Sequence, residues 1–157
     1  MINDLINENI ELFHQNCENK NIKIQNKLEE HISVYVDYDM INAVFRNLIS
    51  NALKFTDTNG VITISAELRK NQVIVSISDT GRGIDEEMLN TLFNPSIKTT
   101  TTGTKGEPGA GFGLLLCKEL INKNDGTIWI DSELEVGTTV YFTLLRNPTE
   151  NISLPTS

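Results

Sequence analysis

The sequence contains no apolar run that approaches the roughly 20 residues needed to cross a bilayer. Residues 1–13 are amphipathic and acidic, and they lack the basic stretch with which a secretory signal begins. Only two cysteines are present, Cys17 and Cys117, and their spacing is not that of metal ligands. Cys117 stands among leucines, which predicts a buried core thiol. These absences fit a protein of the reducing cytoplasm.

Positive charge is also scarce, because 13 lysines and arginines stand against 21 aspartates and glutamates, for a net charge of −8. The sequence shows no basic face, so we do not expect a general nucleic-acid binder. An acidic protein that binds an anion must supply local cations, backbone amides at a helix start, or a metal ion. The 157 residues suit one domain with a sizeable core.

Hydrophobic periodicity predicts helices and strands along most of the chain. Helices are expected over residues 2–16, from an N-cap at Asp39 to about Leu53, over 85–93 and over 113–124. Strands are expected, from period-two alternation, over residues 21–28, 33–37, 61–70, 72–79, 127–133 and 138–145. The order of these elements predicts an α/β fold, a two-layer sandwich in which helices cover one face of a mixed sheet.

Three details complete this expectation. The two middle strands form a hairpin that turns at Lys70–Asn71, and its second strand ends at Asp79. Trp129 alternates on a strand and is expected in the core. A polar tail at 148–157 is expected to fray, so the folded domain should span residues 21–147.

The helix that ends near Leu53 carries three polar residues on one face. Asn47 and Asn51 are four residues apart and Lys54 follows three later, so they share that face. Two amides and an ammonium on a partly buried helix need partners, which Mg²⁺ and a phosphate chain would supply. Taken alone, the pattern also fits a helix with three solvated polar residues.

Two motifs with glycines follow. The first, DTGRGI at 79–84, comes directly after a strand, so Asp79 can point into a pocket. The second, GAGFGL at 109–114, precedes a helix, where its glycines leave backbone N–H groups open to phosphates. Each is weak alone, since the first also fits a plain strand-to-helix turn. A long loop rather than a strand precedes the second motif, which argues against a Rossmann fingerprint.

In this order, the three motifs resemble the N, G1 and G2 boxes of the histidine-kinase catalytic domain. The ATP-binding fold of this domain is shared with gyrase-, Hsp90- and MutL-type ATPases. The resemblance covers nearly the whole chain. It implies the Bergerat ATP-binding fold with ATP and Mg²⁺ as ligands. It also implies that the γ-phosphate is donated to a histidine on a separate dimerisation domain, in two-component signal transduction.

The resemblance gives each matching residue a role. Asn51 would coordinate Mg²⁺, with Asn47 and Lys54 acting beside the metal and phosphates as catalytic residues. Asp79 would accept a hydrogen bond from the adenine amino group, and Phe55 would cover the adenine or ribose. The other nucleotide-binding positions that it implies are Gly81, Gly83, Ile84, Gly109, Gly111, Phe112, Gly113, Leu114 and Thr139. Phe112 stands where the family usually has Leu, an apolar exchange.

The loop at about 94–111 would be the nucleotide lid, irregular without nucleotide and ordered by bound phosphates. Lys98 and Lys105 are its cations, and either would reach the γ-phosphate, with Lys98 counted among the catalytic residues. Both also fit solvated loop lysines. Leu92–Phe93 occupies the place of the family's F box.

A histidine kinase also needs a phosphoacceptor histidine, and neither His14 nor His31 has the sequence context of one. Residues 1–20 resemble the helix that leads from the dimerisation domain into the catalytic domain. We therefore expect a catalytic domain cut from a longer sensor kinase, or a stand-alone partner acting in trans. Its partners would be a phosphoacceptor helical hairpin and, indirectly, a response regulator. The chain itself would touch neither membrane nor nucleic acid, and it would lie in the cytoplasm, alone or as part of a membrane-anchored sensor.

Asn47 distinguishes the expected histidine kinase from ATPases and kinases that share the same ATP-binding fold. Gyrase-like ATPases carry a glutamate there as general base for water, and anti-sigma-factor kinases usually carry an acidic residue. An amide cannot take a proton, which disfavours both. A nucleotide-binding regulatory module without phosphotransfer remains an alternative, because the acceptor is absent.

Overall fold

The computed structural model describes residues 1–28, 31–90 and 113–147. In chain order its elements are α1 (Ile2–Leu12), α2 (His14–Lys20), β1 (Lys23–Asn26), α3 (Tyr38–Phe55), β2 (Val61–Leu68), β3 (Gln72–Asp79), α4 (Glu86–Leu89), α5 (Gly113–Lys123), β4 (Ile128–Glu133) and β5 (Gly137–Leu145). The strands form one sheet in the order β1-β2-β3-β5-β4. β1 pairs with β2 in parallel, and the other pairs are antiparallel. This mixed sheet confirms the predicted fold class.

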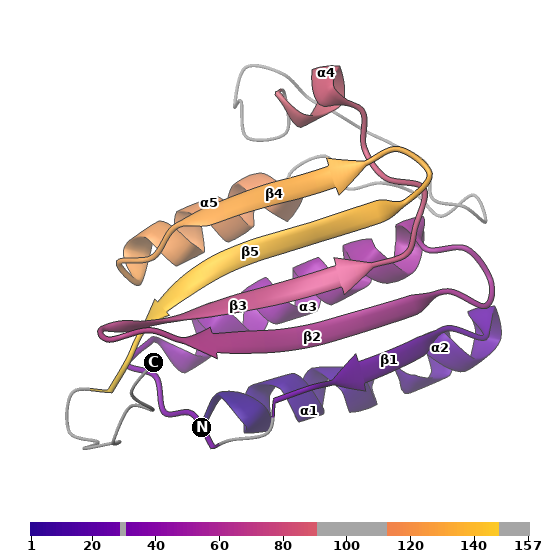
Figure 1. Cartoon of the computed structure of the whole chain (residues 1–157). Coiled ribbons are helices and arrows are strands. Elements are labelled where there is room, and N and C mark those ends of the chain that lie inside the picture. Colours follow the sequence, from indigo (N-terminus) through magenta and orange to yellow (C-terminus); the bar gives the residue numbers. More distant parts are fainter. Residues whose placement is uncertain (29–30, 91–112, 148–157) are drawn as a thin grey trace.

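The helices α1, α3 and α5 lie side by side on one face of the sheet, as Figure 1 shows. Alternate residues of the central strands point toward them and are buried: Ile62, Ile64, Val73, Val75, Ile77, Phe142 and Leu144. Phe45 of α3 meets Phe142 edge-on, with ring centroids 5.4 Å apart. The core therefore lies between this helical layer and the sheet. Within the described residues, no helix is both long and apolar enough to cross a membrane.

The helical layer also contains a buried amide pair. Asn9 of α1 is 2% exposed, and its Nδ2 donates to the Leu5 carbonyl and to Asn42 Oδ1 of α3, each at 2.8 Å. A buried amide is tolerated only when it is hydrogen-bonded, so this pair favours one register of α1 on α3.

Three expectations about individual elements were wrong. Residues 33–37 are not a strand, because Val34 forms only an isolated bridge with Arg146. The N-cap of α3 is Asp37 rather than Asp39: its carboxylate accepts the Met40 N–H at 3.0 Å, while Asp39 lies in the first turn. The expected helix over 2–16 divides at Phe13, and α2 continues to Lys20 before Asn21 takes a left-handed conformation.

Trp129 was also misplaced by the pattern. It is 39% exposed and stacks on Tyr141 with ring centroids 5.4 Å apart, on the face of the sheet opposite the helices. Cys117 is fully buried, as expected.

Candidate functional site

The polar face of α3 is the first part of the site. Asn47, Asn51 and Lys54 are half-buried, while the residues that face the core are buried. The amide Nδ2 of Asn47 donates to the Ala43 carbonyl at 2.8 Å. This bond fixes the amide along the helix, with Oδ1 turned toward the start of α5.

The start of α5 is the second part. A Cβ placed on Gly113, the first residue of α5, would lie 3.7 Å from Asn51 Nδ2 and 3.8 Å from Asn47 Oδ1. Both amides therefore border the first turn of α5. The first four N–H groups of a helix have no partner within it, and its dipole is positive there. The N–H groups at the start of α5, together with Lys54 in the last turn of α3, therefore suit a phosphate chain.

Asp79 ends β3 and is the third part. Its Oδ1 accepts the Gly81 N–H at 2.9 Å, and the backbone N–H of Thr138 also donates to the carboxylate. Burial raises the pKa of Asp79 to about 6, and the two backbone bonds only partly oppose this. A carboxyl group with a strongly shifted pKa beside a polar helix face is typical of a functional site.

The backbone after Asp79 is packed against two other segments. A Cβ on Gly81 would lie 2.3 Å from the Phe55 carbonyl oxygen. Gly83 has φ +72°, and a Cβ there would lie 2.1 Å from the Glu133 carbonyl oxygen. These contacts require glycine at both positions whether or not a base is bound. The first contact places the Asp79 loop against the end of α3, and the second places it against the end of β4.

Phe55 is a half-buried aromatic ring at the end of α3, next to two cations. Lys54 Nζ lies 5.1 Å from the ring centroid and Arg82 Cζ lies 4.8 Å from it. Attraction between a cation and an aromatic face operates at these distances. The sequence motifs assign Arg82 no role, and the only signal that could have marked it is its position between the two glycines of DTGRGI.

The register of β3 and β5 bears on Thr139. Thr138, not Thr139, stands opposite Asp79, and its Oγ1 lies 2.8 Å from Ser132 Oγ. Because side chains alternate along a strand, Thr139 points to the other face, where its hydroxyl lies 2.9 Å from that of Ser78. This geometry argues against Thr139, and it favours Thr138, as the threonine beside a base held by Asp79.

The remaining sequence-derived positions divide into described and undescribed residues. Ile84 is half-buried and its N–H donates to Ser132 Oγ at 2.8 Å, and Leu114 is half-buried in the first turn of α5. His31 is exposed, and His14 is an exposed residue of α2 that contacts Glu18. Outside the described residues lie the lid at 94–111 and the positions Leu92, Phe93, Lys98, Lys105, Gly109, Gly111 and Phe112.

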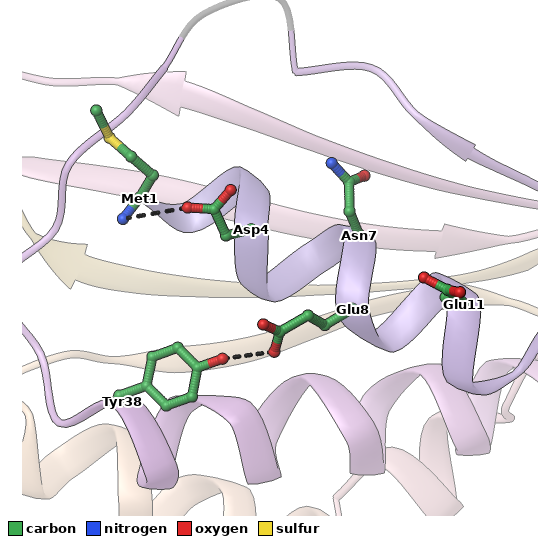
Figure 2. A pocket seen from close by; sticks show the side chains of 6 residues that line it. All are labelled: Met1, Asp4, Asn7, Glu8, Glu11 and Tyr38. Carbon is green, nitrogen blue, oxygen red and sulfur yellow. Dashed lines mark hydrogen bonds and ion pairs between the residues drawn. The ribbon is translucent and has the colours of Figure 1, made fainter.

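A separate groove lies along α1 and the start of α3, lined by Met1, Asp4, Asn7, Glu8, Glu11 and Tyr38 (Figure 2). The Tyr38 hydroxyl donates to Glu8 Oε2 at 2.5 Å. Tyr38 begins α3, whereas Lys54 lies in its last turn, so the groove and the polar face are at opposite ends of the helix. Its carboxylates make the groove unsuitable for an anionic ligand.

Comparison with known proteins agrees with this arrangement. Residues 36–148 match the family model for the histidine kinase-, DNA gyrase B- and HSP90-like ATPases. The chain is 34% identical, over 147 residues, to the autoinducer 2 sensor kinase/phosphatase LuxQ of Vibrio parahaemolyticus, covering 88% of this chain and 17% of that protein. It is 37% identical, over 129 residues, to the adaptive-response sensory kinase SasA of Gloeothece citriformis, covering 81% of this chain and 32% of that protein. The chain thus spans no more than about a third of these two relatives.

Among solved structures, the nucleotide-free catalytic domain of the histidine kinase ThkA superposes with a TM-score of 0.78 and 31% identity. That match covers 92% of this chain and 91% of the ThkA domain. Three motifs in the expected order, the meeting of Asn47, Asn51 and Gly113 where α3 and α5 adjoin, and these matches lead to one conclusion: the chain belongs to the family of histidine kinase-, DNA gyrase B- and HSP90-like ATPases.

Proposed function

We propose that this domain binds ATP with Mg²⁺ and donates the γ-phosphate to a histidine on a separate dimerisation domain. The observation that carries the proposal is the meeting of Asn47, Asn51 and the first turn of α5 at one place. The loop after Asp79 is packed against the end of that same helix, α3. A base and a phosphate chain can therefore be bound side by side.

In this proposal Asp79 accepts a hydrogen bond from the adenine amino group, with Thr138 beside it. Phe55 and Ile84 supply apolar surface for the base and sugar. Lys54 and the N–H groups at the start of α5 bind phosphate oxygens. Lys98 or Lys105 of the lid is proposed to reach the γ-phosphate.

The residues present fit Mg²⁺ as a metal held jointly by protein and nucleotide. Among the described residues, no group of three or more His, Cys, Asp or Glu side chains could hold a metal ion by itself. The polar face instead offers the amide oxygens of Asn51 and Asn47, and Mg²⁺ commonly uses one or two protein ligands together with phosphates and water. When bound, the ion would neutralise charge on the phosphate chain.

The chemical step in this proposal is transfer to a nucleophile outside the chain. Asn47 offers no general base for water, so the side chains only position the phosphates and neutralise their charge. The relatives LuxQ and SasA are sensor kinases, and ThkA has been solved in complex with the response regulator TrrA. We accordingly infer a phosphoacceptor hairpin as direct partner and a response regulator as indirect partner, both in the cytoplasm, where ATP is present.

The test mixes the domain with a phosphoacceptor hairpin domain and ATP labelled at the γ-phosphate. We expect a label on the hairpin that is stable to base and labile to acid, as a phosphohistidine is. Calorimetry on the same samples measures ATP binding with and without Mg²⁺. Binding without labelled hairpin would favour a nucleotide-binding regulatory module, and absence of binding would refute the proposal.

A further inference from the structure

Lys20 is a buried lysine at the end of α2. It is 6% exposed, and its Nζ donates to the carbonyl of Leu53 at 2.8 Å and to that of Lys54 at 3.2 Å. A lysine ammonium is rarely buried unless partners replace its hydration. The two carbonyls therefore help to hold this charge inside the molecule.

These carbonyls belong to the last turn of α3, where the final four carbonyls of a helix lack partners within it. The Ala52 carbonyl accepts the N–H of Thr56 at 3.0 Å and its hydroxyl at 2.5 Å. The Phe55 carbonyl accepts the Arg82 N–H at 3.3 Å. Lys20 supplies the donor for the two carbonyls in between. A positive charge at this negative end of the helix dipole is also favourable.

The turn of α3 that Lys20 contacts contains two residues of the proposed nucleotide site. Lys54 and Phe55 are its last two residues, and their side chains are 5.1 Å apart from Nζ to ring centroid. The Phe55 carbonyl is packed so closely against Gly81 that a Cβ there would approach to 2.3 Å. A shift of this turn would therefore displace both side chains and the loop after Asp79.

We propose that Lys20 is a positioning residue of the nucleotide site, which fixes the last turn of α3 and through it Lys54 and Phe55. The inference rests on the proposed binding of ATP. Lys20 lies outside residues 36–148, which the family model matches. The coupling makes α2 the element through which a movement of the N-terminal helices would change nucleotide affinity.

A purely structural role for Lys20 predicts a loss of global stability alone. Lys20→Met keeps most of the apolar stem and removes the charge and the donors. Cys17→Ala is the matched control, because Cys17 is a buried side chain of the same helix, 5% exposed. Both variants are studied at a temperature where urea titration shows them to be folded.

Two measurements decide between the roles. The first is hydrogen exchange of the Arg82 amide in the nucleotide-free protein, and the second is calorimetric titration with ATP and Mg²⁺. We expect Lys20→Met to lose protection at Arg82 and to bind ATP at least about fivefold more weakly, equivalent to roughly 1 kcal/mol. Cys17→Ala should retain both properties.

The proposal is overturned if Lys20→Met keeps the protection of Arg82 and wild-type affinity, or if Cys17→Ala shows the same losses. A wild-type protein that binds no nucleotide would refute the proposed function, while exchange at Arg82 would still decide whether Lys20 holds the turn. If Lys20→Met does not fold, Lys20→Gln, which keeps an amide donor without the charge, replaces it in both measurements.

Discussion

Asp79→Asn is the substitution that separates nucleotide recognition from folding most cleanly. The carboxylate accepts backbone N–H groups of Gly81 and Thr138, and burial raises its pKa to about 6. Asparagine has nearly the same shape but replaces one oxygen by an NH₂ group. Its remaining oxygen can accept one N–H, whereas its NH₂ group can only donate.

The expected effect on folding is small, because two terms oppose each other. A rise in pKa from 3.8 to about 6 corresponds to a penalty of roughly 3 kcal/mol on the buried ionised form at neutral pH. The substitution removes this penalty and leaves one backbone N–H poorly paired, at a cost of about 1–3 kcal/mol. The free energy of unfolding should therefore rise by no more than about 2 kcal/mol, or stay unchanged.

The expected effect on ATP is large. Loss of one hydrogen bond to a buried polar group costs about 1–3 kcal/mol, so affinity should fall roughly five- to 150-fold. The new NH₂ group can donate to a 6-oxo base, so inosine triphosphate should bind as well as before or better. The reversal of base preference is the specific sign of a contact between Asp79 and position 6 of the purine.

Calorimetric titration with both nucleotides measures this preference, and urea denaturation measures stability. Asp131→Asn is the matched control, since Asp131 is an exposed aspartate paired with Thr139 on the other face of the sheet. A folded Asp79→Asn protein that binds ATP within about twofold of wild type would refute the reasoning. Asp79 would then be a turn residue that satisfies the Gly81 and Thr138 amides.

Three further outcomes are expected. Asn51→Ala should remove most of the Mg²⁺-dependent part of ATP affinity and phosphotransfer, and calorimetry that shows unchanged Mg²⁺ dependence would contradict its role as a metal ligand. Because burial raises the pKa of Asp79 to about 6, its ionisation should lower the free energy of unfolding as pH rises from about 4 to 6. ATP affinity should weaken below about pH 6, where the carboxylate becomes protonated. Denaturation and ATP titration across this range should show both effects of Asp79 in wild type and neither in Asp79→Asn. Gly83→Ala should destabilise by more than about 2 kcal/mol, since alanine is strained at φ +72° and would meet the Glu133 carbonyl, whereas Gly113→Ala, with no described residue closer than 3.7 Å to the new Cβ, should unfold in urea like wild type.

Hydrophobic periodicity correctly predicted the elements whose pattern is contained within a short stretch of sequence. The hairpin of β2 and β3 follows from strict alternation on both sides of Lys70–Asn71, and α3 from its apolar stripe. The cap of α3 was misassigned because Asp37 and Asp39 both satisfy the N-cap preference, and sequence alone does not say which begins the helix. Trp129 was misplaced because period two tells which residues share a face but not which face the helices cover.

The parts of the site that escaped prediction depend on contacts between distant segments. Arg82 matters because its guanidinium meets the Phe55 ring, and Thr138 because the register of β5 places it opposite Asp79. Lys20 reaches α3 across more than 30 residues of sequence, so no local pattern marks it. By contrast, Asn47 and Asn51 could be found directly, since one helix places both on one face.

The parallel pairing of β1 with β2 has a consequence for the order in which the chain folds. β2 pairs with β3 across a short turn. The pairing of β1 with β2, by contrast, closes a long loop that contains α3. Non-local parallel pairs form slowly because chain entropy is lost before any contact is gained. We therefore expect pulse-labelled amides of Lys23–Asn26 to become protected later than those of the β2–β3 hairpin. β1 would then join the sheet after the β2–β3 hairpin has formed, although it precedes both of these strands in the sequence.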